Sequence, residues 1–333
     1  MPFFPSAILR FACFPALFPK NEPRLLRAWW FSLRPRTLPL AALGILAGHA
    51  LAYAFYSAWD ARIFCFSFLT ALSLQILANF ANDYGDAEKS ADTPCRAGPL
   101  RGMQQGLISP AAMRTALAAI VLITLILGSL LIASACAVVT DALVFFVLGA
   151  LSLLAALFYT VGRYAYGYRG LGDLSVLVFF GWLSVCGSFY LQTHVFDWRM
   201  FLPATACGLL SVLVLNANNL RDFEEDRNAG KNTLAVKLGF ARARKYFAAL
   251  VYASFLCLMA FAWIARADRP GVWLFLAALP FFWENAAAAR RLTTPEAFRP
   301  RLAAALKLNL VALGSLIAGL FLSEFWSFGT IPF

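Results

Sequence analysis

The sequence predicts an all-α, polytopic membrane protein with nine transmembrane helices, and three observations lead to this prediction. First, 61% of the 333 residues are hydrophobic and only 14% are charged, whereas an average soluble domain has about 45–50% and about 25%. Second, the apolar residues gather in runs of about 20, the length that crosses the hydrocarbon core as a helix. Third, the sequence lacks the alternation of polar and apolar residues that marks a transmembrane β-barrel.

Each of the nine apolar runs is interpreted as one spanning helix. The first run is interrupted only by His49, and the third and fourth runs are separated at Thr140–Asp141. The expected spans are residues 38–57, 63–82, 116–139, 142–161, 174–193, 200–220, 246–265, 271–288 and 308–326.

The positions of Lys and Arg predict how these spans are oriented. With a cytoplasmic N-terminus, 24 of the 28 basic residues fall in cytoplasmic segments. Cytoplasmic loops of membrane proteins are enriched in Lys and Arg, so this split supports the count of nine. We therefore expect a multi-pass protein of the cell inner (plasma) membrane, with the C-terminus on the opposite side.

The remaining composition excludes several classes of protein. The net charge of +11 is explained by loops that face anionic headgroups, so no nucleic-acid partner is expected. Seven cysteines without a CxxC pair and only two histidines argue against a zinc site. Residues 1–28 are rich in Pro and Phe and too broken for a signal peptide or a span. We expect them to form a peripheral or poorly ordered extension before a single domain over residues 29–333.

Acidic and amide side chains occupy the end of the second span, where most transmembrane helices carry none. Their spacing of i, i+3, i+4 and i+7 puts them on one helical face. They are Asn79, Asn82, Asp83 and Asp86.

The end of the sixth span repeats this pattern on the same predicted side of the membrane. Here Asn219, Asp222 and Asp226 stand at i, i+3 and i+7, again on one face of a helix.

The two rows together predict a metal and diphosphate site. A charged side chain near the membrane centre costs about 2.5–3.5 kcal/mol, so acids there need a cationic partner. Hard oxygen ligands suit Mg²⁺, which keeps waters and shares phosphate oxygens. The alternative is that both rows are helix ends among the headgroups, with asparagines that hydrogen-bond between helices.

Basic and aromatic residues near the two rows predict further contacts to a diphosphate. Lys89 and Arg101 follow the first row, and Lys231 follows the second in a glycine-containing loop that can approach a phosphate. Tyr159 and Arg163, four residues apart at the end of the fourth span, point to the same rim.

Five segments resemble the UbiA superfamily of intramembrane prenyltransferases, and the likeness runs over residues 30–325. Within the superfamily, the segments are most similar to the branch that acts on 1,4-dihydroxy-2-naphthoate. One departure from the superfamily is Ser90, which stands where the first motif usually has a third Asp; the next acid is Asp92. The segments are LRPRTLPLA (33–41), NDYGDAEKSADTPCRAGPLRGMQQG (82–106), YGYRGLGD (166–173), FFGW (179–182) and NNLRDFEEDRNAGKNTLAVKLG (218–239).

The resemblance implies a UbiA-like bundle and a specific reaction. A polyprenyl group would pass from an all-trans polyprenyl diphosphate to 1,4-dihydroxy-2-naphthoate, with loss of CO₂ and diphosphate, in menaquinone biosynthesis. The cofactor would be Mg²⁺, and Asp83, Asp86, Asp222 and Asp226 would be its ligands and the catalytic residues. The lipid-like tail would enter sideways between helices.

The resemblance also assigns roles around the substrates. Tyr159 and Phe180 would shelter an allylic cation, and Arg34 or Arg36 would bind the naphthoate carboxylate. The glycines at 181 and 187 would line a tunnel for the tail or, alternatively, serve the packing of helices. The expected substrate contacts are Arg34, Asn79, Asn82, Lys89, Arg101, Tyr159, Arg163, Asn219 and Lys231.

Two alternatives stay open at this point. The same fold can serve another aromatic acceptor, such as 4-hydroxybenzoate. A transporter or channel also carries acids within the membrane, although usually at the midplane rather than at one rim. The sequence leaves the prenyl chain length and the oligomeric state undetermined.

Overall fold

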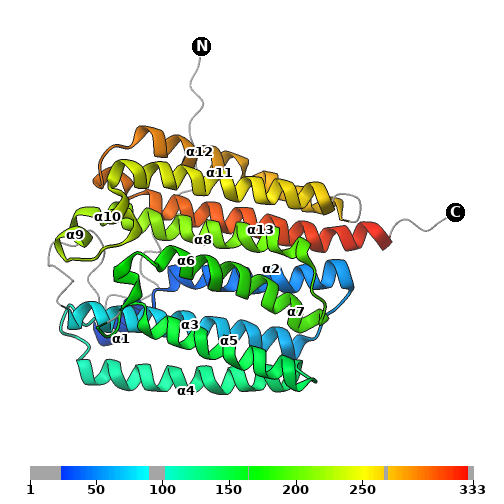
Figure 1. Cartoon of the computed structure of the whole chain (residues 1–333), viewed down its shortest axis with the longest axis horizontal. Helices are drawn as coiled ribbons and strands as arrows, with labels where there is room; N and C mark the ends of the chain where they lie inside the picture. Colours follow the sequence, from blue (N-terminus) through cyan, green and yellow to red (C-terminus); the bar gives the residue numbers. More distant parts are fainter. Residues whose placement is uncertain (1–23, 90–101, 164, 266–268, 329–333) are drawn as a thin grey trace, which may run out of the picture.

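The computed structural model describes residues 24–89, 102–163, 165–265 and 269–328, and these residues form helices and loops without a strand. Nine helical segments within this part of the chain are long and apolar enough to cross a membrane. The all-α prediction is confirmed, and the chain is a multi-pass membrane protein. Its long helices run side by side, nearly parallel (Figure 1).

The helices follow the predicted order of spans, with short helical turns at several ends. The elements up to the fifth span are α1 (Arg24–Leu33), η1 (Pro35–Thr37), α2 (Leu38–Tyr56), α3 (Ala61–Glu88), α4 (Pro110–Ala135), α5 (Val139–Phe158), η2 (Tyr166–Arg169), α6 (Gly172–Val176), the π-helix η3 (Leu177–Gly187) and α7 (Ser188–Thr193). The rest are η4 (Trp198–Met200), α8 (Phe201–Arg221), α9 (Phe223–Asn228), α10 (Leu234–Leu238), α11 (Phe240–Ala265), η5 (Pro270–Ala278), α12 (Leu279–Arg291), η6 (Glu296–Phe298) and α13 (Arg301–Phe328).

Two predicted boundaries differ from the structure. The break between the third and fourth spans lies at residues 136–138, and Asp141 belongs to the first turn of α5. A carboxylate is favoured there because the helix N-terminus carries partial positive charge. In addition, α1 begins at Arg24, and its Ala28 is buried against Ile108 and Met113. Residues 24–27 are exposed, and residues 1–23 lie outside the described part.

The bundle is layered around α8, which is its most enclosed span. It packs against α11, η3 and α13. In turn α2 contacts η3, α13 and α3, and α3 carries α4 and α5 along its outer side (Figure 1). The α5 span is exposed along its length, as expected of a helix that faces lipid.

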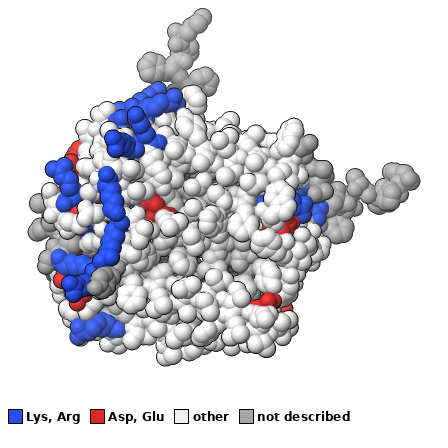
Figure 2. Space-filling view, in the orientation of Figure 1, with Lys and Arg blue, Asp and Glu red and all other residues white. Residues whose placement is uncertain are grey.

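One end of the bundle gathers the polar chain connections. The ends of α3, α5 and α8 lie there beside α9 and α10, and Figure 2 shows most of the visible Lys and Arg at this end. A broad white belt without charge separates it from a smaller charged group at the opposite end. We call these the polar end and the far end.

The crossing of η3 over α8 depends on two facing glycines. A Cβ on Gly181 would lie 2.6 Å from the Ala204 carbonyl oxygen and 2.8 Å from the Gly208 Cα. We therefore expect Gly181→Leu to lower the free energy of unfolding by about 1–3 kcal/mol or more, because added methylenes in a packed interior force backbone shifts.

Thermal unfolding in detergent would measure this loss. Gly314→Leu is the control, because a Cβ at Gly314 meets nothing within 4 Å. Equal midpoints for the two variants would contradict the tight crossing.

Candidate active site

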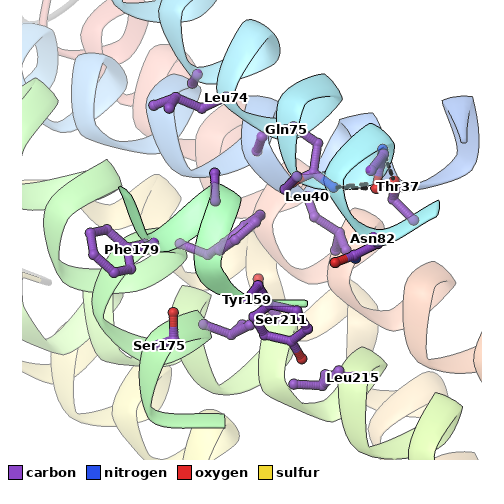
Figure 3. Close-up of a pocket in the computed structure, with 18 of the residues that line it drawn as sticks. Thr37, Leu40, Leu74, Gln75, Asn82, Tyr159, Ser175, Phe179, Ser211 and Leu215 are labelled. Carbon is purple, nitrogen blue, oxygen red and sulfur yellow. Dashed lines mark hydrogen bonds between the residues drawn. The ribbon is translucent and has the colours of Figure 1, made fainter. Parts of the chain in front are cut away.

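A cavity of about 1630 Å³ connects the polar end with the apolar interior of the bundle. Its walls come from α2, α3, α5, η3 and α8, with α1, α4 and α13 at the margins. Figure 3 shows Gln75 and Asn82 of α3 on one wall, with Tyr159, Ser211 and Leu215 across from them. The polar lining residues include Arg34, Asn79, Asn82, Asp86, Asn219, Arg221, Asp222, Asp226 and Lys231.

The first row lies on α3, which continues as a helix past the membrane span to Glu88. Three of its four members, Asn79, Asn82 and Asp86, line the cavity. Asn79 donates to the Leu33 carbonyl oxygen at 2.8 Å, and Asn82 accepts from the Thr160 hydroxyl at 3.0 Å. These amides therefore tie α3 to its neighbours as well as facing the cavity.

Asp83 departs from the prediction that all four members face the site. It is 1% exposed, and its Oδ1 accepts from the Arg34 guanidinium at 2.6 Å. The physical reason is the helical rotation of about 100° per residue, which turns Asp83 from the Asn82 direction toward the α1–η1 connection. Arg34 itself lines the cavity and has a left-handed backbone (φ 52°, ψ 63°), a strained state that is common at functional sites.

The second row also differs from the expected single helical face. The helix α8 ends at Arg221, and Asp222 (φ −94°, ψ 15°) separates it from the short α9. Asn219, Asp222 and Asp226 nevertheless line the cavity together. The Asp222 carboxylate is bound in bidentate fashion by Arg221, with both N···O distances at 2.6 Å.

Asp86 is the acidic residue where three segments of chain meet. Its Oδ1 accepts from Lys231 Nζ at 2.9 Å and from the Tyr168 hydroxyl at 2.5 Å. Lys89 lies nearby, but it is not among the residues that line the cavity. Its Nζ donates to the Thr160 carbonyl oxygen at 2.7 Å, and burial lowers its pKa while Asp86 and Glu88 oppose that shift.

Tyr159 lines the cavity just beyond the end of α5, and the loop of residues 166–173 encloses its ring. A Cβ on Gly172 would lie 2.6 Å from the Tyr159 hydroxyl oxygen, so this loop needs glycine there. Burial raises the pKa of the Tyr159 phenol above its usual value, which keeps it protonated. Arg163 is exposed and does not line the cavity, and Arg101 and Asp92 lie outside the described residues.

The deeper cavity is apolar, and one of the two glycines expected at a tunnel lies on its wall. Phe179, Phe180 and Gly187 line the cavity, whereas Gly181 packs on α8. From α5, mostly small or apolar residues between Phe145 and Ala156 also line the cavity. These walls suit a long hydrocarbon chain.

Two side chains that contact the candidate acids are not predicted from the sequence as site residues. Tyr168 and Arg221 both stand in the segments that carry the family resemblance, which was the available signal. Tyrosine and arginine at membrane boundaries are otherwise explained as interfacial anchors and inside-positive charges. Their roles appear only when the partners Asp86 and Asp222 are placed beside them.

The donor set fits Mg²⁺ that is shared with a phosphate rather than a closed protein cage. Within the described ranges, no three His, Cys, Asp or Glu side chains converge as a metal site. Asp86, Asp222 and Asp226 instead line one cavity together with amide and basic side chains, among them Asn82, Asn219, Arg221 and Lys231. Mg²⁺ usually takes one or two carboxylates and completes its octahedron with waters and phosphate oxygens.

Comparison with known proteins agrees with this arrangement. A model of the UbiA prenyltransferase family matches residues 41–311. The 1,4-dihydroxy-2-naphthoate octaprenyltransferase of Escherichia coli (strain K12) is 49% identical over 298 residues, which cover 90% of this chain and 96% of that protein. The protein of the same name from Mycobacterium tuberculosis is 39% identical over 67% of this chain and 74% of its own length.

The fold also matches solved structures. A UbiA homolog from Archaeoglobus fulgidus bound to GPP and Mg²⁺ aligns with a TM-score of 0.59, over 89% of this chain and 99% of that one, at 14% identity. The family model covers most of the nine spans and both acidic rows. The chain therefore belongs to the UbiA prenyltransferase family.

Proposed function

We propose that the protein transfers a polyprenyl group from an all-trans polyprenyl diphosphate to 1,4-dihydroxy-2-naphthoate, with loss of CO₂ and diphosphate. The product is a demethylmenaquinol, and the pathway is menaquinone biosynthesis. The observation that carries this proposal is the 49% identity, over nearly the whole of both chains, with a 1,4-dihydroxy-2-naphthoate octaprenyltransferase. The cavity supports it, because one end is charged and the other is apolar.

The diphosphate is assigned to the polar end, between the two acidic rows. Asp86, Asp222 and Asp226 would hold Mg²⁺ there, with help from Asn82 and Asn219. Mg²⁺ supplies neutralisation of the diphosphate charge when it is bound. Lys231 and Arg221 line the same cavity as these acids. The ion pairs of Lys231 with Asp86 and of Arg221 with Asp222 hold both basic side chains where they can contact phosphate oxygens.

The transfer begins with the loss of diphosphate from the prenyl donor. The allylic C–O bond breaks and its electron pair leaves with the diphosphate. Tyr159 and Phe180 line the adjoining cavity and offer aromatic faces to the allylic cation. The electron-rich naphthoate carbon that bears the carboxylate then forms the new C–C bond.

Release of CO₂ completes the balance of the reaction. The electrons of the bond to the carboxylate return to the ring, which restores its aromaticity without a base. Both histidines lie away from the polar end. His49 hydrogen-bonds to Ser67 and Gln192, and His194 lies beside Asp141 at the far end. Arg34, oriented by Asp83, is the cation that we assign to the acceptor carboxylate.

The orientation proposed is N-terminus cytoplasmic and C-terminus on the opposite side of the inner membrane. The polar end, which carries most visible Lys and Arg (Figure 2), then faces the cytoplasm. Water-soluble naphthoate would reach the site from that side, and the prenyl diphosphate from the lipid.

The proposed reaction is tested by its carbon balance. Membranes that contain the protein, Mg²⁺, farnesyl diphosphate and naphthoate labelled at the carboxyl carbon should release labelled CO₂ in equal amount to prenylated naphthol. A chelator should stop both, and added Mg²⁺ should restore them. Consumption of 4-hydroxybenzoate in place of the naphthoate would contradict the assigned acceptor.

Loss of one site carboxylate should stop turnover without unfolding the protein. We expect Asp222→Asn to lower kcat/KM by about 10²–10³, because a preorganised charge in the site is removed. Asp197→Asn is the matched control, since Asp197 forms a similar pair with Arg199 at 2.8 Å at the far end. Normal rates for Asp222→Asn, measured by product formation, would refute its role.

The prenyl tail is proposed to leave the cavity between α5 and η3. Both helices line the cavity, yet α5 packs on α3 and α4 while η3 packs on α2 and α8. Gly149 of α5 lines the cavity and is exposed, and a Cβ there meets nothing within 4 Å.

Gly149→Trp should therefore lower kcat/KM for an octaprenyl donor by about tenfold through steric exclusion, and leave geranyl diphosphate nearly unaffected. The control is Leu151→Trp, because Leu151 is half exposed on the same helix and does not line the cavity. Steady-state rates with the two donors measure the effect, and an equal loss for both donors would contradict this exit.

A further inference from the structure

Tyr168 links the first acidic row to the loop that follows the second row, although it belongs to neither row. It lies in η2, between the fourth and fifth spans. Its hydroxyl donates to Asp86 Oδ1 at 2.5 Å, the same oxygen that accepts from Lys231 at 2.9 Å. Its carbonyl oxygen accepts from the backbone N–H of Asn232 at 3.1 Å, which ties η2 to the α9–α10 connection.

The ring of Tyr168 also contacts both lysines that follow the acidic rows. The Lys89 ammonium lies 4.2 Å from the ring centroid and the Lys231 ammonium 5.1 Å from it. Two ammonium groups at one ring repel each other, and the electron-rich face together with Asp86 offsets that repulsion. The Lys89 ammonium also donates to the Thr160 carbonyl oxygen at 2.7 Å. Of these two lysines, Lys231 lines the cavity.

We propose that Tyr168 is a positioning residue of the diphosphate site. Its hydroxyl orients the Asp86 carboxylate toward the cavity, and its ring holds Lys231 against the cavity wall. This inference rests on the proposed function, because it assigns Asp86 to a Mg²⁺–diphosphate complex. Partners that hydrogen-bond a ligating carboxylate typically change metal affinity by about 10–100-fold when they are removed.

Tyr168→Phe tests the hydroxyl alone, because the ring and its two ammonium contacts remain. Titration calorimetry with an unreactive thio analogue of geranyl diphosphate would measure binding to detergent-solubilised protein at increasing Mg²⁺. We expect the half-saturating Mg²⁺ concentration to rise about 10–100-fold, with the KM for naphthoate unchanged and kcat largely restored at saturating Mg²⁺.

Tyr190→Phe is the matched control. It also removes a tyrosine–aspartate hydrogen bond, from the Tyr190 hydroxyl to Asp141 Oδ2 at 3.1 Å, at the far end of the bundle. Its Mg²⁺ dependence should equal that of the unmodified protein.

A second variant separates the ring from the hydroxyl. Tyr168→Leu should raise the KM for the prenyl diphosphate beyond the value for Tyr168→Phe, because Lys231 loses its aromatic contact as well. An unchanged Mg²⁺ dependence in Tyr168→Phe, or an equal change in Tyr190→Phe, would overturn the proposal. Failure of the unmodified protein to bind the analogue would instead count against the proposed function.

Discussion

Carboxylates at the edge of an apolar bundle must be neutralised, and this requirement organises the polar end of the molecule. A buried charge without a partner is strongly destabilising, whereas a well-placed ion pair offsets much of its desolvation cost. Asp83 pairs with Arg34, Asp86 with Lys231, and Asp222 with Arg221. Each of these three acids therefore has a basic side chain within 3 Å.

These ion pairs determine which segments of chain meet at the site. Arg34 brings the connection between α1 and α2 against α3, and Lys231 brings the α9–α10 connection over Asp86. A diphosphate with Mg²⁺ presents both anionic oxygens and a cation, so it can satisfy the members of such pairs separately. The charged side chains of these ion pairs can thus exchange their partners in the protein for diphosphate oxygens or Mg²⁺. The backbone can stay in place during this exchange.

The second organising constraint is that the cavity has a polar region and an apolar region. Its polar end is lined by charges and amides, and its interior by apolar side chains from α5 and η3. A prenyl diphosphate has the same division between head and tail, which sets its direction in the cavity. The aromatic residues Tyr159 and Phe180 line the same cavity.

The sequence by itself determined the nine spans, the end of the bundle where the two acidic rows meet, and the three acids that line the cavity. These features follow from hydrophobic length and helical period, which are local properties of the chain. The packing decided the rest. Asp83 contacts Arg34, and the helix ends before Asp222. Gly181 packs at the α8 crossing while Gly187 faces the cavity, and Tyr168 hydrogen-bonds to Asp86. Which neighbour meets a given helical face depends on contacts between segments far apart in the chain, and a local period carries no information about them.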